Sequence, residues 1–146
     1  MKKVLLVVAV IALISVATMA LVGCVPSDPA KAEANLKDAG YEVMVTKASD
    51  STGVQHGTGI QLGPNAVADG CVTMITAMKA TISNDDADFD GVVIYYFNDG
   101  AKAKAFYEKQ KARYDKLSDE EKEGSKVGKS GKVVYVGTEE AIKAAK

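Results

Sequence analysis

Three aspartates alternate with other residues in the segment Asp86-Ala87-Asp88-Phe89-Asp90-Gly91. Carboxylates at alternate positions, followed by a glycine where the backbone turns sharply, can wrap a hard cation such as calcium. In a helix–loop–helix calcium site the twelfth position is a bidentate glutamate, but here it is Phe97, and a strand pattern follows. We therefore expect an acidic turn over residues 84–91. Two interpretations stay open: a loose calcium site formed by Asp86, Asp88 and Asp90, or a solvated hairpin turn.

Two further patterns could serve catalysis or phosphate binding. His56 is the only histidine, and Cys71 could form a nucleophilic pair with it, because a thiolate needs a nearby base. No third residue is evident to orient that base, so we expect Cys71 to be a small buried hydrophobic residue. Gly128-Lys129-Ser130 matches the end of a phosphate-binding loop, but Glu123 stands where the first glycine is required. We therefore predict no phosphate loop.

The other cysteine, Cys24, ends a long apolar run. Lys2 and Lys3 begin the chain, and no residue from Val4 to Gly23 is charged. The stretch Leu21-Val22-Gly23-Cys24 resembles a bacterial lipobox, and the leader resembles that of small Gram-positive lipoproteins of uncharacterised function. The resemblance implies a signal peptide over residues 1–23, cleavage after Gly23 and a diacylglyceryl group on the thiol of Cys24.

The location implied by that resemblance is the outer face of the cytoplasmic membrane, where the lipid on Cys24 anchors the protein. The alternative is an uncleaved signal anchor, because an apolar run of this length can span a bilayer. Both interpretations leave the two N-terminal lysines in the cytoplasm and the rest of the chain outside. Residues 24–28 would then be the lipidated cysteine and a short tether, and residues 29–146 a single domain of ordinary size.

The periodicity of the remaining chain predicts an α+β fold. We expect a two-layer sandwich with one mixed or antiparallel sheet of about four strands, helices mainly on one face, and the order α-β-β-β-α-β-α. The unbroken apolar run 92–97 is typical of a central strand covered on both faces. Residues 124–132 are polar and indicate a connector. The other expected elements are helices over 29–39, 101–117 and after Thr138, and strands over 41–46, 71–82 and 133–136.

Charge is unevenly distributed along the chain. Residues 24–101 carry four basic and eleven acidic side chains, whereas residues 102–132 carry ten basic and six acidic ones. The basic segment is either a solvated helix face or a surface for anionic lipid or wall polymer. Nucleic acid is not expected outside the cell.

We expect a non-enzymatic binding or interaction module with no cofactor apart from the lipid, whose partner is a protein, a wall polymer or a small ligand. Two alternatives remain. One is a calcium-binding or metal-dependent domain that uses the acidic turn. The other is a precursor whose released leader acts as a signalling peptide.

Overall fold

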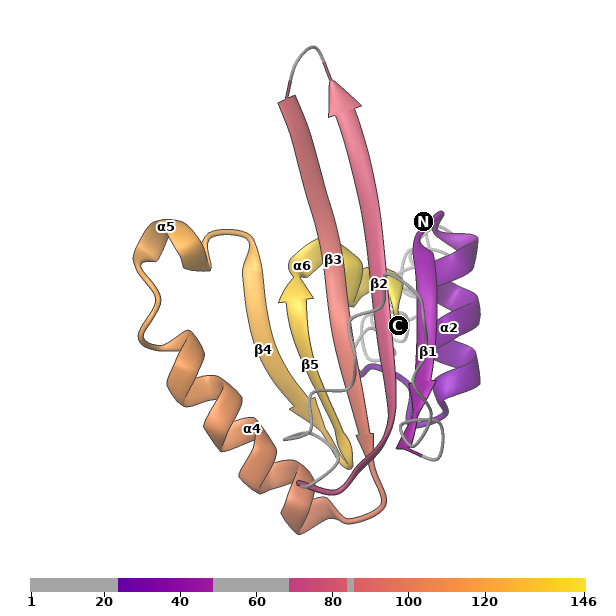
Figure 1. The fold of residues 1–146 in the computed structure, drawn as a ribbon, viewed down its shortest axis with the longest axis vertical. Helices are drawn as coiled ribbons and strands as arrows, with labels where there is room; N and C mark the ends of the chain where they lie inside the picture. The colour runs from indigo at the N-terminus through magenta and orange to yellow at the C-terminus, as the bar shows by residue number, and fades with distance from the viewer. Residues whose placement is uncertain (1–23, 49–68, 84–85) are drawn as a thin grey trace, which may run out of the picture.

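The computed structural model describes residues 24–48, 69–83 and 86–146, with the backbone alone over 81–83 and 86–88. One antiparallel sheet has five strands in the order β1-β2-β3-β5-β4 (Figure 1). The α+β class with an antiparallel sheet is thus confirmed, and β3 is the central strand that its apolar run predicted. The strands are β1 (Glu42–Lys47), β2 (Cys71–Ser83), β3 (Asp86–Phe97), β4 (Ser125–Ser130) and β5 (Val133–Thr138).

Each helix begins at a side-chain cap. The Asp28 carboxylate accepts from the Ala30 N–H before α2 (Pro29–Asp38), and Pro29 fills the first helical position, where no backbone donor is needed. Asp99 caps α4 (Gly100–Tyr114) in the same way, and Ser118 and Glu121 form a reciprocal capping box around α5 (Asp119–Lys122). Thr138 caps α6 (Glu139–Ala144). The three helix starts predicted from the sequence lie within one residue of the observed starts of α2, α4 and α6.

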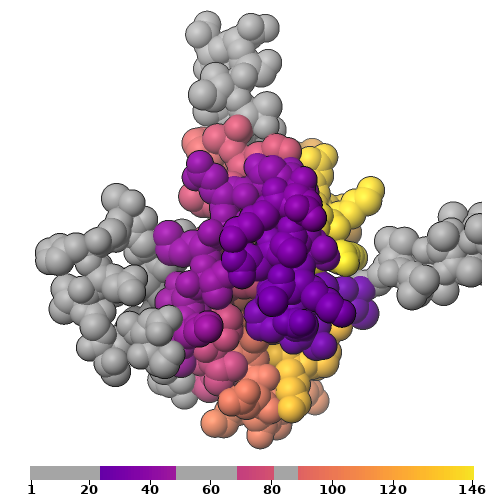
Figure 2. All heavy atoms as spheres, turned by 90° about the vertical axis from the view of Figure 1, so that its right-hand side faces the viewer, coloured from indigo at the N-terminus to yellow at the C-terminus, as the bar shows by residue number. Residues whose placement is uncertain are grey.

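The two faces of the sheet carry separate cores, because successive residues of a strand point to opposite sides. On the first face, Ile75 and Ile94 pack with Leu36 of α2 and Ile142 of α6. On the second face, Phe97 and Val134 pack with Phe106 of α4. We call these the α2/α6 face and the α4 face. Figure 2 shows α2 covering its side of the molecule with the C-terminal residues beside it.

Two of the predicted boundaries are wrong. The segment 124–132, expected to be a connector, contains the edge strand β4, whose backbone pairs with β5 from Ser125↔Thr138 to Ser130↔Val133. The lysines of this segment made the strand unrecognisable in the sequence, because an exposed edge strand tolerates polar residues and so lacks an apolar pattern. The expected turn over 84–91 is also mostly strand: β3 begins at Asp86, which pairs with Ser83. The helices are divided between both faces, since α4 lies opposite α2 and α6.

Strands β2 and β3 extend well beyond their neighbours. Pairing with β1 ends at Met78, and pairing with β5 ends at Val92, yet β2 and β3 stay paired as far as Ser83 and Asp86. Residues 79–83 and 86–90 therefore form a paired two-stranded segment, the hairpin arm, that projects from the sheet (Figure 1). At the base of the arm, a Cβ on Gly137 would lie 2.6 Å from the Val92 Cα, so only glycine fits between β3 and β5 there.

Candidate functional site

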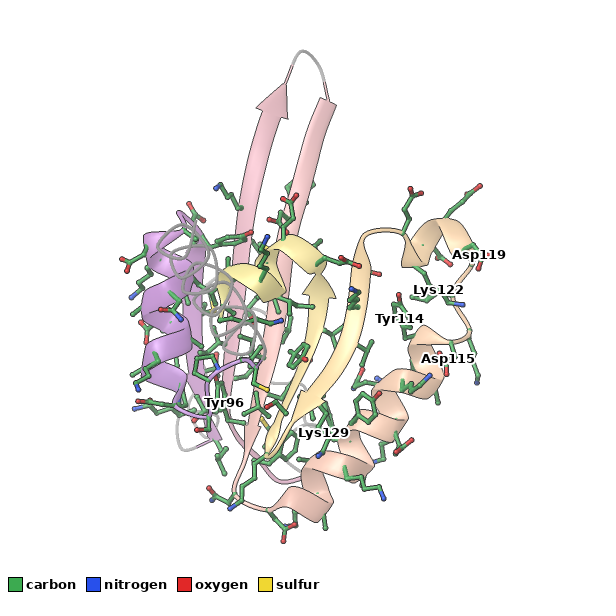
Figure 3. The ribbon with its side chains drawn as sticks, turned by 180° about the vertical axis from the view of Figure 1, so that it is seen from behind. Tyr96, Tyr114, Asp115, Asp119, Lys122 and Lys129 are labelled. Atoms are coloured by element: carbon green, nitrogen blue, oxygen red, sulfur yellow. The ribbon has the colours of Figure 1, made fainter. Side chains whose placement is uncertain are left out.

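The proposed lipidation residue, Cys24, is exposed, but the next residue is part of the core. Val25 is only 2% exposed and belongs to the cluster formed by α2, α6 and the sheet. Seen from behind in Figure 3, the segment that leads into α2 crosses the sheet on the same side as α6. Residue 24 therefore leaves the molecule from the α2/α6 face.

The surroundings of Cys24 include a tyrosine of β5. Tyr135 pairs in register with Ile94, so its ring lies on the α2/α6 face, above Gly128 of β4, where a Cβ would clash with it. The pKa of Tyr135 is raised above its ordinary value, first by burial and then by the charge of the nearby Cys24 sulfur. Gly128 thus serves packing, and the Gly128-Lys129-Ser130 segment lies in a strand, as the rejection of a phosphate loop requires.

The second candidate surface is the outer side of α4, on the opposite face of the sheet. We call the six exposed cations of α4 and the turn after it the basic surface: Lys102, Lys104, Lys109, Lys111, Arg113 and Lys116. Two are paired, because Lys109 contacts Asp69 at 2.6 Å and Lys111 contacts Asp115 at 2.8 Å. The other four have no ion pair among the described residues. Because Ala103 and Phe106 are buried on the inner side, the helical cations lie on the exposed part of α4, with Lys104 and Lys111 on one flank and Lys102, Lys109 and Arg113 on the other.

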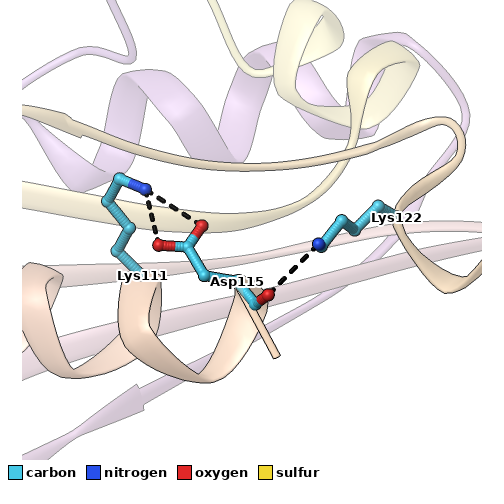
Figure 4. A network of polar contacts seen from close by, with 3 residues as sticks. All are labelled: Lys111, Asp115 and Lys122. Atoms are coloured by element: carbon cyan, nitrogen blue, oxygen red, sulfur yellow. Dashed lines mark hydrogen bonds and ion pairs between the residues drawn. The ribbon is translucent and has the colours of Figure 1, made fainter. Parts of the chain in front are cut away.

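The end of α4 is fixed by a network of polar contacts. The Lys111 ammonium donates to both oxygens of Asp115, which raises the pKa of Lys111, and Lys122 donates to the Asp115 carbonyl at 3.2 Å (Figure 4). The Tyr114 hydroxyl donates to the Ser125 carbonyl at 2.7 Å, which joins α4 to the start of β4 (Figure 3). The basic surface is therefore carried by a helix tied to the sheet at its C-terminal end, with a stable geometry for a partner to recognise.

A polar cluster joins the hairpin arm to both helices of the α2/α6 face. Asp90 accepts hydrogen bonds from the hydroxyls of Tyr41 and Thr138, and Thr138 also caps α6 by accepting from the Ala141 N–H. Lys79, which pairs with Asp90 across the arm, lies 5.5 Å above the Tyr41 ring and donates to the Ala39 carbonyl. Burial and the adjacent Asp90 carboxylate raise the pKa of Tyr41.

The acidic segment therefore has a different geometry from the one its sequence indicates. Asp86, Asp88 and Asp90 lie on one extended strand, where positions two residues apart are separated by about 6.5 Å. A calcium loop needs the backbone to wrap around the ion instead. Asp90 already holds two hydroxyls, and the side chains of Asp86 and Asp88 lie outside the described residues. Calcium binding here stays a prediction.

Cys71 is buried, as its expected role of a small hydrophobic residue requires, and it is not accessible for a nucleophilic pair. Cys71 is 1% exposed, and its thiol donates to the Thr73 carbonyl at 3.2 Å. Burial raises the pKa of this thiol to about 11, so it is protonated at neutral pH. His56 lies outside the described residues, as do residues 1–23. Among the residues that the structure describes, no group of three His, Cys, Asp or Glu side chains is placed to hold a metal ion.

The anchoring role of Val25 was missed by sequence reasoning. The only signal was an aliphatic residue between Cys24 and Pro26 in a segment read as a tether.

Within the described residues, no helix has the length and apolar character needed to cross a membrane. No family model, curated protein or solved structure matches the chain.

Proposed function

We propose that the protein is a membrane-anchored extracytoplasmic lipoprotein that works as a non-enzymatic binding module. Two features support the anchor: the lipobox-like stretch ending at Cys24 and the exposure of that residue. Diacylation makes attachment persistent, since each buried methylene contributes about 0.8 kcal/mol and a single acyl chain is only marginal.

The basic surface of α4 is the observation that carries the binding role. It places five exposed cations on one helix and a sixth, Lys116, just after it, and the acids of the same segment are Asp99, Glu108 and Asp115. In a mature chain that is acidic overall, such a concentration of positive charge favours a polyanion. We assign the partner as an anionic polymer of the cell wall.

Lipidation is tested by expressing the full chain in a Gram-positive host and measuring the intact mass of the membrane-bound product. The expected mass is that of residues 24–146 plus a diacylglyceryl group or its further acylated form. The Cys24→Ser variant should remain unprocessed. An intact mass that retains Met1 and carries no lipid would refute the lipoprotein assignment and favour an uncleaved signal anchor.

Polymer binding is tested with charge-removing variants. A triple variant with Lys104, Arg113 and Lys116 changed to Gln should bind inorganic polyphosphate about a hundredfold more weakly, at about 1 kcal/mol for each lost cation. The matched control changes Lys31, Lys37 and Lys143 to Gln, which removes the same charge from the α2/α6 side. Equal losses in both variants would mean that the affinity reflects net charge and not the basic surface.

A further inference from the structure

The position of Val25 restricts how the domain can lie on a membrane. Whatever group holds the chain in the bilayer, an acylated Cys24 or an uncleaved apolar run, leaves the bilayer one residue before Val25. Val25 is fixed in the core between the sheet and its two helices, so residue 24 cannot move far from the α2/α6 face. Burial of a valine side chain favours this docked arrangement by roughly tenfold or more.

Release of Val25 would not free the domain to turn over. The five residues 24–28 reach at most about 17 Å when fully extended, and the next residue begins α2. A packed helix adds about 10 Å to each face of the sheet. The tether is therefore too short to pass around the sheet edge and leave α4 against the bilayer.

Charge does not oppose this orientation. The α2/α6 face presents basic and acidic groups in nearly equal number, and two of the pairs are ion pairs: Lys37 with Glu33 at 2.6 Å, and Lys126 with Glu139 at 2.7 Å. The basic surface, in contrast, has an excess of cations and lies on the opposite face. An anionic bilayer would attract α4, but the anchor point is on the other side.

We propose that the α2/α6 face lies against the lipid headgroups, and that the basic surface of α4 points into the aqueous phase. This inference rests on the membrane attachment proposed above. It also decides between the two anionic partners, because a surface directed away from the bilayer meets soluble or wall-bound polymer and not the lipid of its own membrane.

The orientation can be measured by fluorescence, because the chain contains no Trp. Ala34 lies near the middle of α2 and Ala112 in the last turn of α4; both alanines are exposed, and each is changed singly to Trp. The full chain is expressed, purified from membranes in its natural processed form and reconstituted into phosphatidylcholine vesicles. The vesicles contain phosphatidylcholine with a nitroxide on its headgroup, which quenches nearby indoles.

We expect strong quenching of the Ala34→Trp variant and little quenching of the Ala112→Trp variant. Equal quenching, or stronger quenching at position 112, would overturn the orientation. A flexible Gly/Ser insert of about twelve residues between Cys24 and Val25 keeps Val25 in the core but lengthens the tether. It should abolish the difference between the two reporters; a difference that persists would show that Val25 does not set the orientation.

The intact mass of each preparation separates this inference from the proposed function. A protein that carries no lipid but stays in the membrane through an uncleaved leader refutes lipidation, and the quenching pattern still tests the orientation. Recovery of the protein entirely in the soluble fraction would overturn both. The last experiment repeats the measurement with vesicles that contain phosphatidylglycerol. If the Ala112→Trp variant then becomes the more strongly quenched of the two, the anionic lipid is the partner of the basic surface and the proposed orientation is wrong.

Discussion

Cys24 and Val25 are adjacent in the chain but lie in opposite environments: the first is exposed, and the second is buried in the core of the α2/α6 face. A domain joined to a proposed lipid anchor through a long flexible linker could rotate freely, but Cys24 has no such linker before the buried Val25. The proposed attachment point is a fixed position on the surface of the fold, and the proposed membrane side and aqueous side follow from it.

The two cysteines should differ completely in reactivity. Cys24 is exposed, whereas Cys71 is 1% exposed with a thiol pKa raised to about 11 by burial. Unprocessed protein in its folded state should therefore react with iodoacetamide at one thiol, and denatured protein at two. Naturally processed protein should show no reactive thiol when folded and one when denatured. A free Cys24 thiol in that second preparation would contradict acylation.

Alkaline pH should destabilise the fold through Cys71. The unfolded thiol loses its proton near pH 9, whereas the folded one keeps it up to about pH 11. The contribution of Cys71 to stability is thus complete below pH 9 and is lost as the pH rises from 9 to 11, by roughly 2–3 kcal/mol. Urea unfolding at several pH values measures this slope. The Cys71→Ala variant should be less stable at every pH but should show a shallower alkaline decline; a parallel decline would assign the effect to tyrosines.

Two tyrosines of the same face should respond differently to loss of the hydroxyl. Tyr41 donates to Asp90, so Tyr41→Phe leaves a carboxylate short of one donor and should cost about 1–3 kcal/mol. The Tyr96 hydroxyl is buried and finds no partner among the described residues, so Tyr96→Phe should be neutral or stabilising. Chemical denaturation gives both values. Similar losses for the two variants would mean that the Asp90 cluster does not hold the arm to the helices.

Substitution of Gly137 should test the close contact between β3 and β5. A Cβ at this position meets backbone atoms of Gly91 and Val92, which cannot move without breaking the ladder. Gly137→Ala should therefore destabilise the protein by about 1–3 kcal/mol or more. Gly100→Ala is the matched control, because no atom lies within 4 Å of its Cβ position and alanine favours the helix. A thermal melt that shows equal stability for the two variants would contradict the observed packing.

Periodicity in the sequence predicted much of this fold because it reports burial. The run Val92 to Phe97 indicated a strand covered on both faces, and β3 is the central strand with a core on each side. The same reasoning failed for β4, which lies at an edge, is held by backbone pairing and has an ordinary polar composition. The two-residue loop Gly131-Lys132, with Gly131 at φ 57°, was the available hairpin signal.

The site depended on information that periodicity does not contain. The apolar stripe of α4 predicts that one side is buried, but it does not say which face of the sheet covers it, and that choice decides where the basic surface points. In the same way, Asp90 looks like part of a turn in the sequence, because its partners Tyr41 and Thr138 are far away in the chain. Lysine content alone identified the basic segment, and burial of Ala103 and Phe106 leaves its cations on the exposed part of the helix.

The unequal strand lengths also affect the order in which the strands pair during folding. The longest strand pair, β2 with β3, joins residues that are close in sequence, so its formation requires little loss of chain entropy. The pairing of Tyr96 with Val133 must close a loop that includes α4, α5 and β4. The hairpin should therefore form early and act as the template on which β1 and β5 dock, and the rate of folding should be limited by the arrival of β5.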